Sequence, residues 1–212
     1  TRSILLLYFG GAPANFYYRT NENSPPAFQV TRLSSVPMIS SRLASTLNRV
    51  CNNDASLLYL DLSLIPLHLQ GDRSFFDRLA KGLNRNTVLT HVCLRNCWLE
   101  SQHLTTLAFS LLLHPTITSV DLSKNQLSTT GFENFAKKLR GHQPSALISL
   151  SLDWNHIENE AAKLLVSALL TNHQLTHLSL TENPIQPGRL ADIDQLISIN
   201  QSFLHSKRDC RK

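Results

Sequence analysis

The sequence predicts an α/β fold in which short strands and helices alternate in a stack of similar units. The first observation is an eleven-residue phrase that recurs five times, starting at Leu57, Leu89, Ile117, Leu147 and Leu175. The second is that apolar residues alternate within each phrase, which is the period of a strand. The third is a helical spacing of apolar residues between the phrases. No unit can bury its apolar face alone, so the units must stack, with parallel strands on one side and helices on the other.

The strand of each unit is predicted from the fourth and sixth positions of its phrase. The copies read LLYLDLSLIPL, LTHVCLRNCWL, ITSVDLSKNQL, LISLSLDWNHI and LTHLSLTENPI. Pairs such as Leu150 with Leu152, or Leu178 with Leu180, place two apolar side chains on the same face of a strand. Each phrase therefore predicts one short strand with its apolar side toward the helices.

The helices are predicted from apolar stripes that follow each phrase. These stripes are Phe75, Phe76, Leu79 and Leu83; Leu104, Leu107, Ala108 and Leu111; Phe132, Phe135, Ala136 and Leu139; Ala161, Leu164, Leu165, Ala168 and Leu169; and Leu190, Ile193, Leu196 and Ile197. A helix in each connection also supplies the long crossover that parallel strands require.

The phrase fits the pattern L-x-x-L-x-L-x-x-N/C-x-L, and its copies start 28 to 32 residues apart. With a full helix per unit, the chain resembles the ribonuclease-inhibitor-like class of leucine-rich repeat proteins over about Phe28 to Phe203. The resemblance implies a solenoid in a curved horseshoe arc, with strands on the concave face and helices on the convex face. This class serves inhibitors, immune sensor regions, actin-end cappers, small-GTPase activators and secreted bacterial effectors, so the resemblance says little about function.

The ninth position of the phrase is where the chain leaves the strand. It holds Asn125, Asn155 and Asn183, and in two units Cys97 and Ile65. The resemblance implies that a buried Asn amide bonds turn groups that would otherwise be unpaired. Cys is a small substitute, whereas Ile followed by proline predicts an irregular turn.

The predicted organisation is an N-terminal cap or edge segment at 1–27, a repeat domain at 28–204 and a basic tail at 205–212. The repeat domain contains the five clear units and one degenerate unit before them, because the segment 42–49 echoes the segment 78–85. The apolar run at 4–9 is too short to span a membrane. A truncated signal peptide also fits it, but we favour an edge strand or an N-terminal cap.

Composition favours a cytoplasmic protein that binds no nucleic acid. The net charge of +5 is concentrated in the tail, and no basic stripe with interleaved aromatic residues accompanies it. The four cysteines do not form the paired caps of extracellular repeat proteins, which favours a reducing compartment. We expect a monomer.

No metal, cofactor or catalytic site is predicted. His91 and His177 lie three strands apart, roughly 14 Å at the usual strand spacing, which is too far to share a zinc ion. A hydrolase triad can be drawn from Ser149, His177 and either Asp153 or Asp121. No glycine-rich turn supplies an oxyanion hole for it and nothing excludes water, so we expect no enzymatic activity.

Function is therefore expected on strand positions two, three, five, seven and eight, which the pattern leaves outside the core. Trp154, at position eight, is the outlier, because tryptophan is frequent among interface hot spots worth ~2 kcal/mol or more. Alternatively, it packs on its own loop over His156 or the stem of Lys124. The residues predicted to bind a partner are Tyr59, His91, Arg95, Asp121, Lys124, Asp153, Trp154, His177 and Glu182.

The sequence thus predicts a protein–protein interaction module that binds through its concave strand face and the rim where the strands end. It would act as a scaffold or as a secreted bacterial effector in host cytosol. One alternative is a small-GTPase regulator, although the related activators carry an acidic tail and this chain ends basic. The other is an actin-end-capping protein, although no actin-binding helix is recognisable.

Overall fold

The computed structural model describes residues 37–65, 67, 73–129, 132–140 and 145–209. The chain divides into two units after Arg42, and the first unit is described only at the start of one helix. The second unit, Leu43–Lys212, contains the whole sheet. The segment predicted as a cap at 1–27, the first part of the predicted repeat domain at 28–36, and Pro66 lie outside the described residues.

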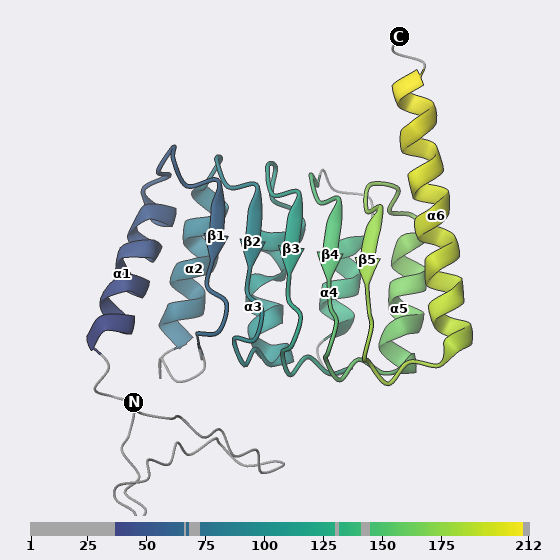
Figure 1. Cartoon of the computed structure of the whole chain (residues 1–212), viewed down its shortest axis with the longest axis horizontal. Helices are drawn as coiled ribbons and strands as arrows, with labels where there is room; N and C mark the ends of the chain where they lie inside the picture. Colours follow the sequence, from purple (N-terminus) through teal and green to yellow (C-terminus); the bar gives the residue numbers. More distant parts are fainter. Residues whose placement is uncertain (1–36, 66, 68–72, 130–131, 141–144, 210–212) are drawn as a thin grey trace, which may run out of the picture. The chain divides into compact units, whose positions relative to one another are not determined.

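Helices and strands alternate strictly along the described residues (Figure 1). The elements are α1 Pro37–Cys51, β1 Tyr59–Asp61, α2 Arg73–Arg85, β2 His91–Cys93, α3 Ser101–Leu112, β3 Ser119–Asp121, α4 Phe132–Leu139, β4 Ser149–Ser151, α5 Asn159–Leu169, β5 His177–Ser179 and α6 Pro187–Asp209. Each strand begins at the third position of its phrase, as the alternation predicts.

The five strands form one parallel sheet in sequence order, β1-β2-β3-β4-β5. The same position of successive phrases lies side by side, so that Tyr59 pairs with His91 and Ser149 pairs with His177. Beyond the strands, the ladder continues through bonds such as Leu62 N–H to the Cys93 carbonyl, at 2.9 Å. The predicted α/β fold of parallel strands alternating with helices is confirmed.

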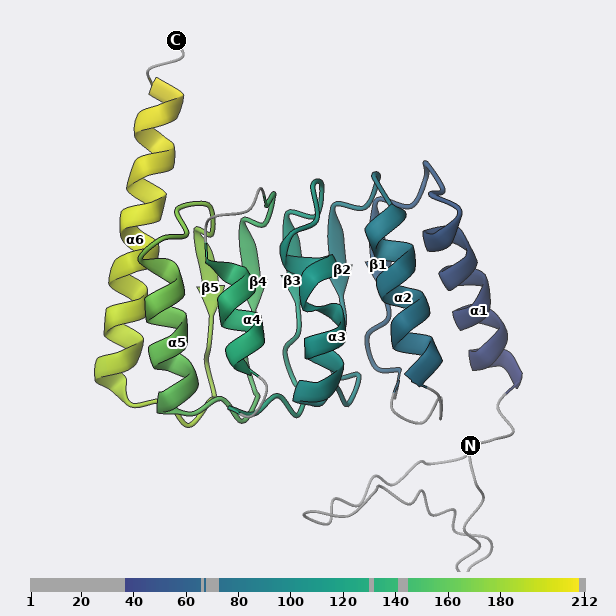
Figure 2. The same ribbon diagram turned by 180° about the vertical axis from the view of Figure 1, so that it is seen from behind.

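The helices cover one face of this sheet and leave the other face open (Figure 2). The predicted apolar stripes are buried between the two layers: Phe132 and Phe135 of α4 are fully inaccessible, as are Leu104 and Leu107 of α3. In α6, Leu190 and Leu196 are only partly buried. The core is therefore continuous from unit to unit, as stacking requires.

The two ends of the array differ in detail from the prediction. Helix α6 continues past the expected end at Leu204 to Asp209, so the start of the predicted basic tail is helical. Helix α1 packs against α2 closely enough that a Cβ at Gly82 would lie 3.0 Å from Cys51 Sγ and 3.2 Å from Val50 Cγ1. Glycine therefore permits this approach.

Among the described helices, none has the length and hydrophobicity needed to cross a membrane.

Candidate partner-binding surface

The turn at the end of each strand carries a backbone feature that the pattern did not predict. Position eight of all five units is left-handed, at Leu64, Asn96, Lys124, Trp154 and Glu182, with φ between 54° and 62°. None of these residues is glycine, and a left-handed conformation costs such residues roughly 1 kcal/mol or more. The five side chains stand in one row where the strands end. Leu64 and Trp154 are 72% and 54% exposed.

Buried asparagines hold this turn. The Asn125 side-chain oxygen accepts bonds from the backbone N–H groups of Cys97 and Leu99, both at 3.0 Å. Its amide nitrogen donates to the carbonyls of Leu94 and Leu122, at 2.9 and 2.8 Å. One side chain therefore joins two successive units and satisfies backbone groups that water cannot reach. The predicted role of asparagine at the ninth position is confirmed.

Cys97 takes part of the same role. Its sulfur lies 2.9 Å from the Leu62 carbonyl, which is the place reached by the amide of an asparagine in later units. Asn155, for example, donates to the Leu122 carbonyl at 3.1 Å. Burial raises the pKa of the Cys97 thiol to about 12, so it stays protonated and can donate this bond. Cys97 is therefore more than an apolar filler.

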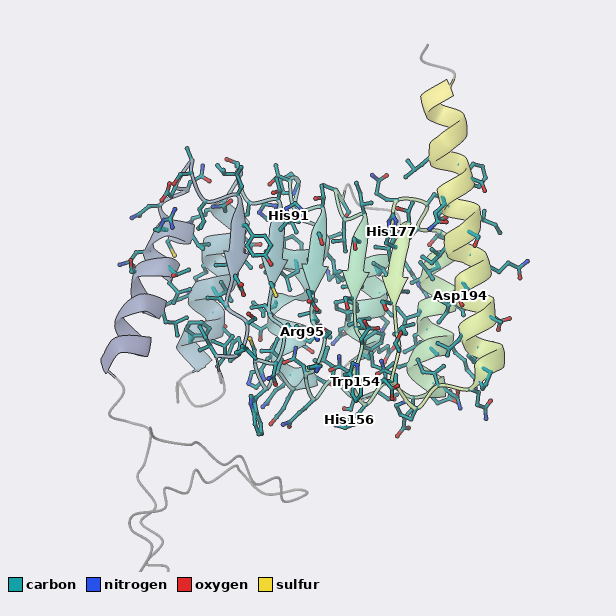
Figure 3. The ribbon with its side chains drawn as sticks, viewed as in Figure 1. His91, Arg95, Trp154, His156, His177 and Asp194 are labelled. Carbon is teal, nitrogen blue, oxygen red and sulfur yellow. The ribbon has the colours of Figure 1, made fainter. Side chains whose placement is uncertain are left out.

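Trp154 lies at the strand-exit edge together with Arg95, whereas His91 and His177 lie toward the opposite end of the strands (Figure 3). The Lys124 ammonium is 5.4 Å from the centroid of the indole ring, within the range of a cation–π contact. The indole is still half-exposed. The tryptophan thus has the neighbour expected from loop packing and also presents a large open surface.

The charged residues around Trp154 differ in how far they are free to bind. Asp153 is committed internally: its carboxylate accepts bonds from the Ser179 hydroxyl at 2.5 Å, the Thr181 backbone N–H at 2.7 Å and the Ser151 hydroxyl at 3.2 Å. It therefore fixes the sheet edge.

Arg95 and Lys124 are the opposite case, because neither forms an ion pair within the described residues. Arg95 donates to the Ser123 hydroxyl at 2.9 Å, which buries Ser123 although its position was expected to be outside the core. The charge that these two side chains offer to a partner is consequently positive.

The remaining predicted residues lie along the open sheet face. Tyr59 and His91 form a tilted ring pair with centroids 6.0 Å apart. Partial burial and the neighbouring Cys93 raise the pKa of Tyr59. Asp121 accepts bonds from the Ser123 backbone and hydroxyl, at 2.8 and 2.5 Å, and so supports Ser123 beneath Arg95.

Beyond these, His177 is exposed and its Nδ1 lies 3.0 Å from the Thr176 hydroxyl. Glu182 is exposed beside Trp154 in the last unit. The nine predicted residues therefore form a band along the sheet rather than one cluster.

The hydrolase triad is not assembled. Ser149 and His177 are register partners, but the Asp153 carboxylate bonds Ser179 and Thr181, and the Asp121 carboxylate bonds Ser123. Among the described residues, no group of three or more His, Cys, Asp and Glu side chains could hold a metal ion. The described cysteines are free thiols.

Comparison with known proteins agrees with this repeat architecture. A family model described as Leucine Rich repeat matches residues 114–136, which run from the turn before β3 into α4. The chain therefore contains leucine-rich repeats. Its repeat array is also similar to parts of much longer proteins.

Three curated relatives share this similarity. NACHT, LRR and PYD domains-containing protein 5 of Mus musculus is 34% identical over 103 residues, which cover 49% of this chain and 9% of that protein. Protein 2 of the same name, from Homo sapiens, is 33% identical over 97 residues, covering 46% and 9%. The human protein 5 is 31% identical over 140 residues, covering 66% and 11%. The matched region thus spans about a tenth of these relatives.

Two solved structures share this fold. Leiomodin-1 Actin-Binding Site 2 superposes with a TM-score of 0.68 at 22% identity, covering 79% of this chain and 94% of that one. The tropomodulin C-terminal domain of Caenorhabditis elegans gives 0.63 at 11% identity, covering 78% and 97%. At these identities the likeness establishes the fold alone.

Proposed function

We propose that this leucine-rich repeat array binds a partner protein through the exit patch, formed by Arg95, Lys124, Asp153 and Trp154. The observation that carries the proposal is the backbone conformation and the exposure of Trp154. A large aromatic side chain occupies a left-handed position and leaves 54% of its surface exposed. Folding gains little from tryptophan there, whereas an interface gains a rigid aromatic anchor.

The electrostatics of the exit patch favour an acidic partner surface. The Asp153 carboxylate is occupied by neighbouring donors, while Arg95 and Lys124 have no carboxylate of their own in the described residues. A partner carboxylate near Trp154 would meet two cations at the rim of an aromatic contact. Such complementarity raises the association rate and fixes orientation.

The surrounding band extends the proposed contact. Tyr59, His91 and Asp121 lie on the open sheet face toward the N-terminal units, and His177 and Glu182 lie in the last unit. Leu64, although absent from the predicted set, is more exposed than Trp154 in the same row. The feature that sets Leu64 apart is its left-handed backbone, which the sequence does not reveal.

Leucine-rich repeats and the fold neighbours found here are typical of binding modules rather than enzymes. We propose a scaffold that acts as a monomer in the cytoplasm. The curated relatives come from mouse and human, and they lend no support to the bacterial-effector interpretation.

The test compares partner capture by the wild-type chain and by the Arg95→Ala/Trp154→Ala variant, with bound proteins quantified by mass spectrometry. A matched control is available in Arg140→Ala/Leu170→Ala. Arg140 donates to the Ser167 hydroxyl at 2.8 Å, as Arg95 does to Ser123, and Leu170 is 60% exposed. We expect the exit-patch variant to lose a partner that the control retains. Equal retention by both variants would reject the exit patch.

Actin is a second candidate, favoured by the fold shared with leiomodin-1 Actin-Binding Site 2. Purified actin can be tested directly, by following polymerisation with increasing amounts of the chain. An effect on polymerisation that disappears in the exit-patch variant would identify actin as the partner. No effect at a large excess of the chain would remove this candidate.

A further inference from the structure

The outer side of α3 differs from the helices on either side of it. No lysine, arginine, aspartate or glutamate occurs between Ser101 and Leu112. By contrast, α2 carries lysine and arginine, and α4 carries two lysines. Phe109 of α3 is 53% exposed on this outer side. An uncharged strip with an exposed aromatic ring therefore runs between two charged helices.

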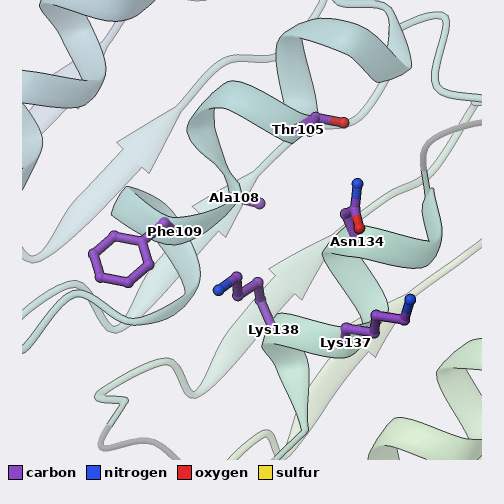
Figure 4. A pocket seen from close by; sticks show the side chains of 6 residues that line it. All are labelled: Thr105, Ala108, Phe109, Asn134, Lys137 and Lys138. Carbon is purple, nitrogen blue, oxygen red and sulfur yellow. The ribbon is translucent and has the colours of Figure 1, made fainter.

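A depression of about 370 Å³ lies between α3 and α4 at this strip (Figure 4). Its lining residues are Thr105, Ala108, Phe109, Asn134, Lys137 and Lys138. The lining combines an apolar wall from α3 with lysine side chains from α4. A concave apolar site with a few charged groups at its margin is a common form of binding site.

The two lysines of the depression have different surroundings. Lys137 is paired with Glu133 at 2.7 Å, one turn earlier in α4. The Lys138 ammonium lies 5.5 Å from the Phe109 ring centroid and forms no ion pair within the described residues. Lys138 is therefore a cation without a carboxylate, beside an exposed aromatic ring.

The neighbouring helix adds charge of the same sign. Arg78, Lys81 and Arg85 are exposed on α2, against the single exposed acid Asp77. Across α2, α3 and α4, the exposed cations thus outnumber the exposed acids. A ligand that reaches beyond the depression would again meet mainly positive charge.

We propose that the depression between α3 and α4 binds an acidic, amphipathic segment of a partner protein. An apolar side chain of the segment contacts Phe109 and Ala108, and a carboxylate one turn away pairs with Lys138. This ligand complements the depression in two ways. Ala108 and Phe109 can contact an apolar group, and the positive charge of Lys138 favours an anionic one. This site lies on the helix side of the array and does not depend on the exit patch.

The test measures fluorescence anisotropy of a labelled peptide titrated with the full chain. The probe is a peptide of roughly 15 residues with leucine at every third or fourth position and glutamate at the flanking positions. The same peptide with lysine in place of glutamate is its control. Phe109→Ser removes the exposed ring, and Lys138→Glu reverses the charge, while neither side chain is buried.

We expect the acidic peptide to bind, and each substitution to weaken binding about tenfold or more. The lysine peptide should not bind, and the exit-patch variant should bind like wild type, since it alters the other face. Failure of the exit patch to capture a partner therefore leaves this result intact. Unchanged melting temperatures confirm that the variants are folded.

Three outcomes would overturn the proposal. The acidic peptide fails to bind the wild-type chain, it binds the Phe109→Ser and Lys138→Glu variants as tightly as wild type, or the lysine peptide binds equally well. Retention on phosphatidylserine vesicles that depends on Phe109, without peptide binding, would assign the depression to a membrane surface instead.

Discussion

At the scale of single residues, polar side chains join each unit to the preceding one at both ends of the strands. The asparagines after the strands were anticipated, but a second set lies before them. Asn86 accepts bonds from the Val88 and Leu89 N–H groups and donates to the Val50 carbonyl. Asn172, just before β5, makes the same three kinds of bond.

His114 occupies the equivalent place and is buried there. Its Nδ1 accepts from the Thr116 and Ile117 N–H groups, both at 3.2 Å, and its Nε2 lies 3.0 Å from the Leu83 carbonyl. These partners require a neutral ring with its proton on Nε2. Through these bonds His114 holds the turn before β3 and joins it to the preceding unit.

We predict that His114→Asn makes the chain less sensitive to acid. Burial lowers the pKa of His114, so the unfolded chain binds a proton near pH 6.5 that the folded chain does not. Stability from this group is present above that pH and is lost as the pH falls, by at most about 1.4 kcal/mol per pH unit. Asparagine preserves the bonds and does not titrate.

Urea unfolding between pH 7.5 and roughly 5 measures this difference. Burial lowers the pKa of His103 in the same direction, so a shallower slope rather than a flat one is expected. Identical slopes for wild type and His114→Asn would contradict the assigned role. His103→Gln serves as a comparison that leaves His114 in place.

We also predict that Leu64→Gly is neutral or stabilising, by up to about 1 kcal/mol. Leu64 has a φ of 62° and is exposed, so glycine relieves backbone strain and loses little packing. Leu58→Gly is the matched control, because Leu58 is 55% exposed without a left-handed backbone and should be destabilised. Melting temperatures that rank the two variants the other way would contradict this account.

At the scale of elements, α6 closes the last unit of the sheet with its side chains. Asn200 is buried and donates to the carbonyls of Asn172 and Leu175, at 2.7 and 2.8 Å. Gln201 donates to the Thr176 carbonyl at 2.7 Å. In an earlier unit the carbonyl equivalent to that of Thr176 accepts a backbone bond from the next unit, as Leu58 does from Thr90. Side chains of α6 therefore replace a further strand.

We predict that Asn200→Ala destabilises the chain by about 1–3 kcal/mol, because two buried carbonyls lose their donor. The loss should be concentrated at the end of the array, so hydrogen exchange should accelerate in β5 more than in β2. Ser198→Ala, on the exposed side of α6, should change stability by no more than about 0.5 kcal/mol. Uniform acceleration across all strands would contradict a local closing role.

Much of this level was predictable from the sequence, since apolar periodicity alone locates the strands and helices. The left-handed position was not, because four of its five residues carry no sequence signal for positive φ and only Asn96 is of a type enriched there. The internal hydrogen bonds of the Asp153 carboxylate could not be predicted either. They depend on Ser179 and Thr181 of the next unit, which only the register brings within reach.

At the scale of the whole array, stability and binding lie on different residues of the same repeat. The apolar positions and the buried amides join neighbouring units, whereas position eight and the outer helix sides contact little within the fold. The absence of charge in α3 can be read from the sequence. The contact between Phe109 and Lys138 cannot, because it depends on how α3 packs against α4.

The most direct test is the dissociation constant of the captured partner for wild type and for the Arg95→Ala/Trp154→Ala variant, measured together with their melting temperatures. We predict binding weakened about tenfold or more, with the melting temperature nearly unchanged, while Arg140→Ala/Leu170→Ala binds as wild type. An unchanged dissociation constant with a lowered melting temperature would instead make Trp154 a residue of the fold, and would contradict the proposed exit patch.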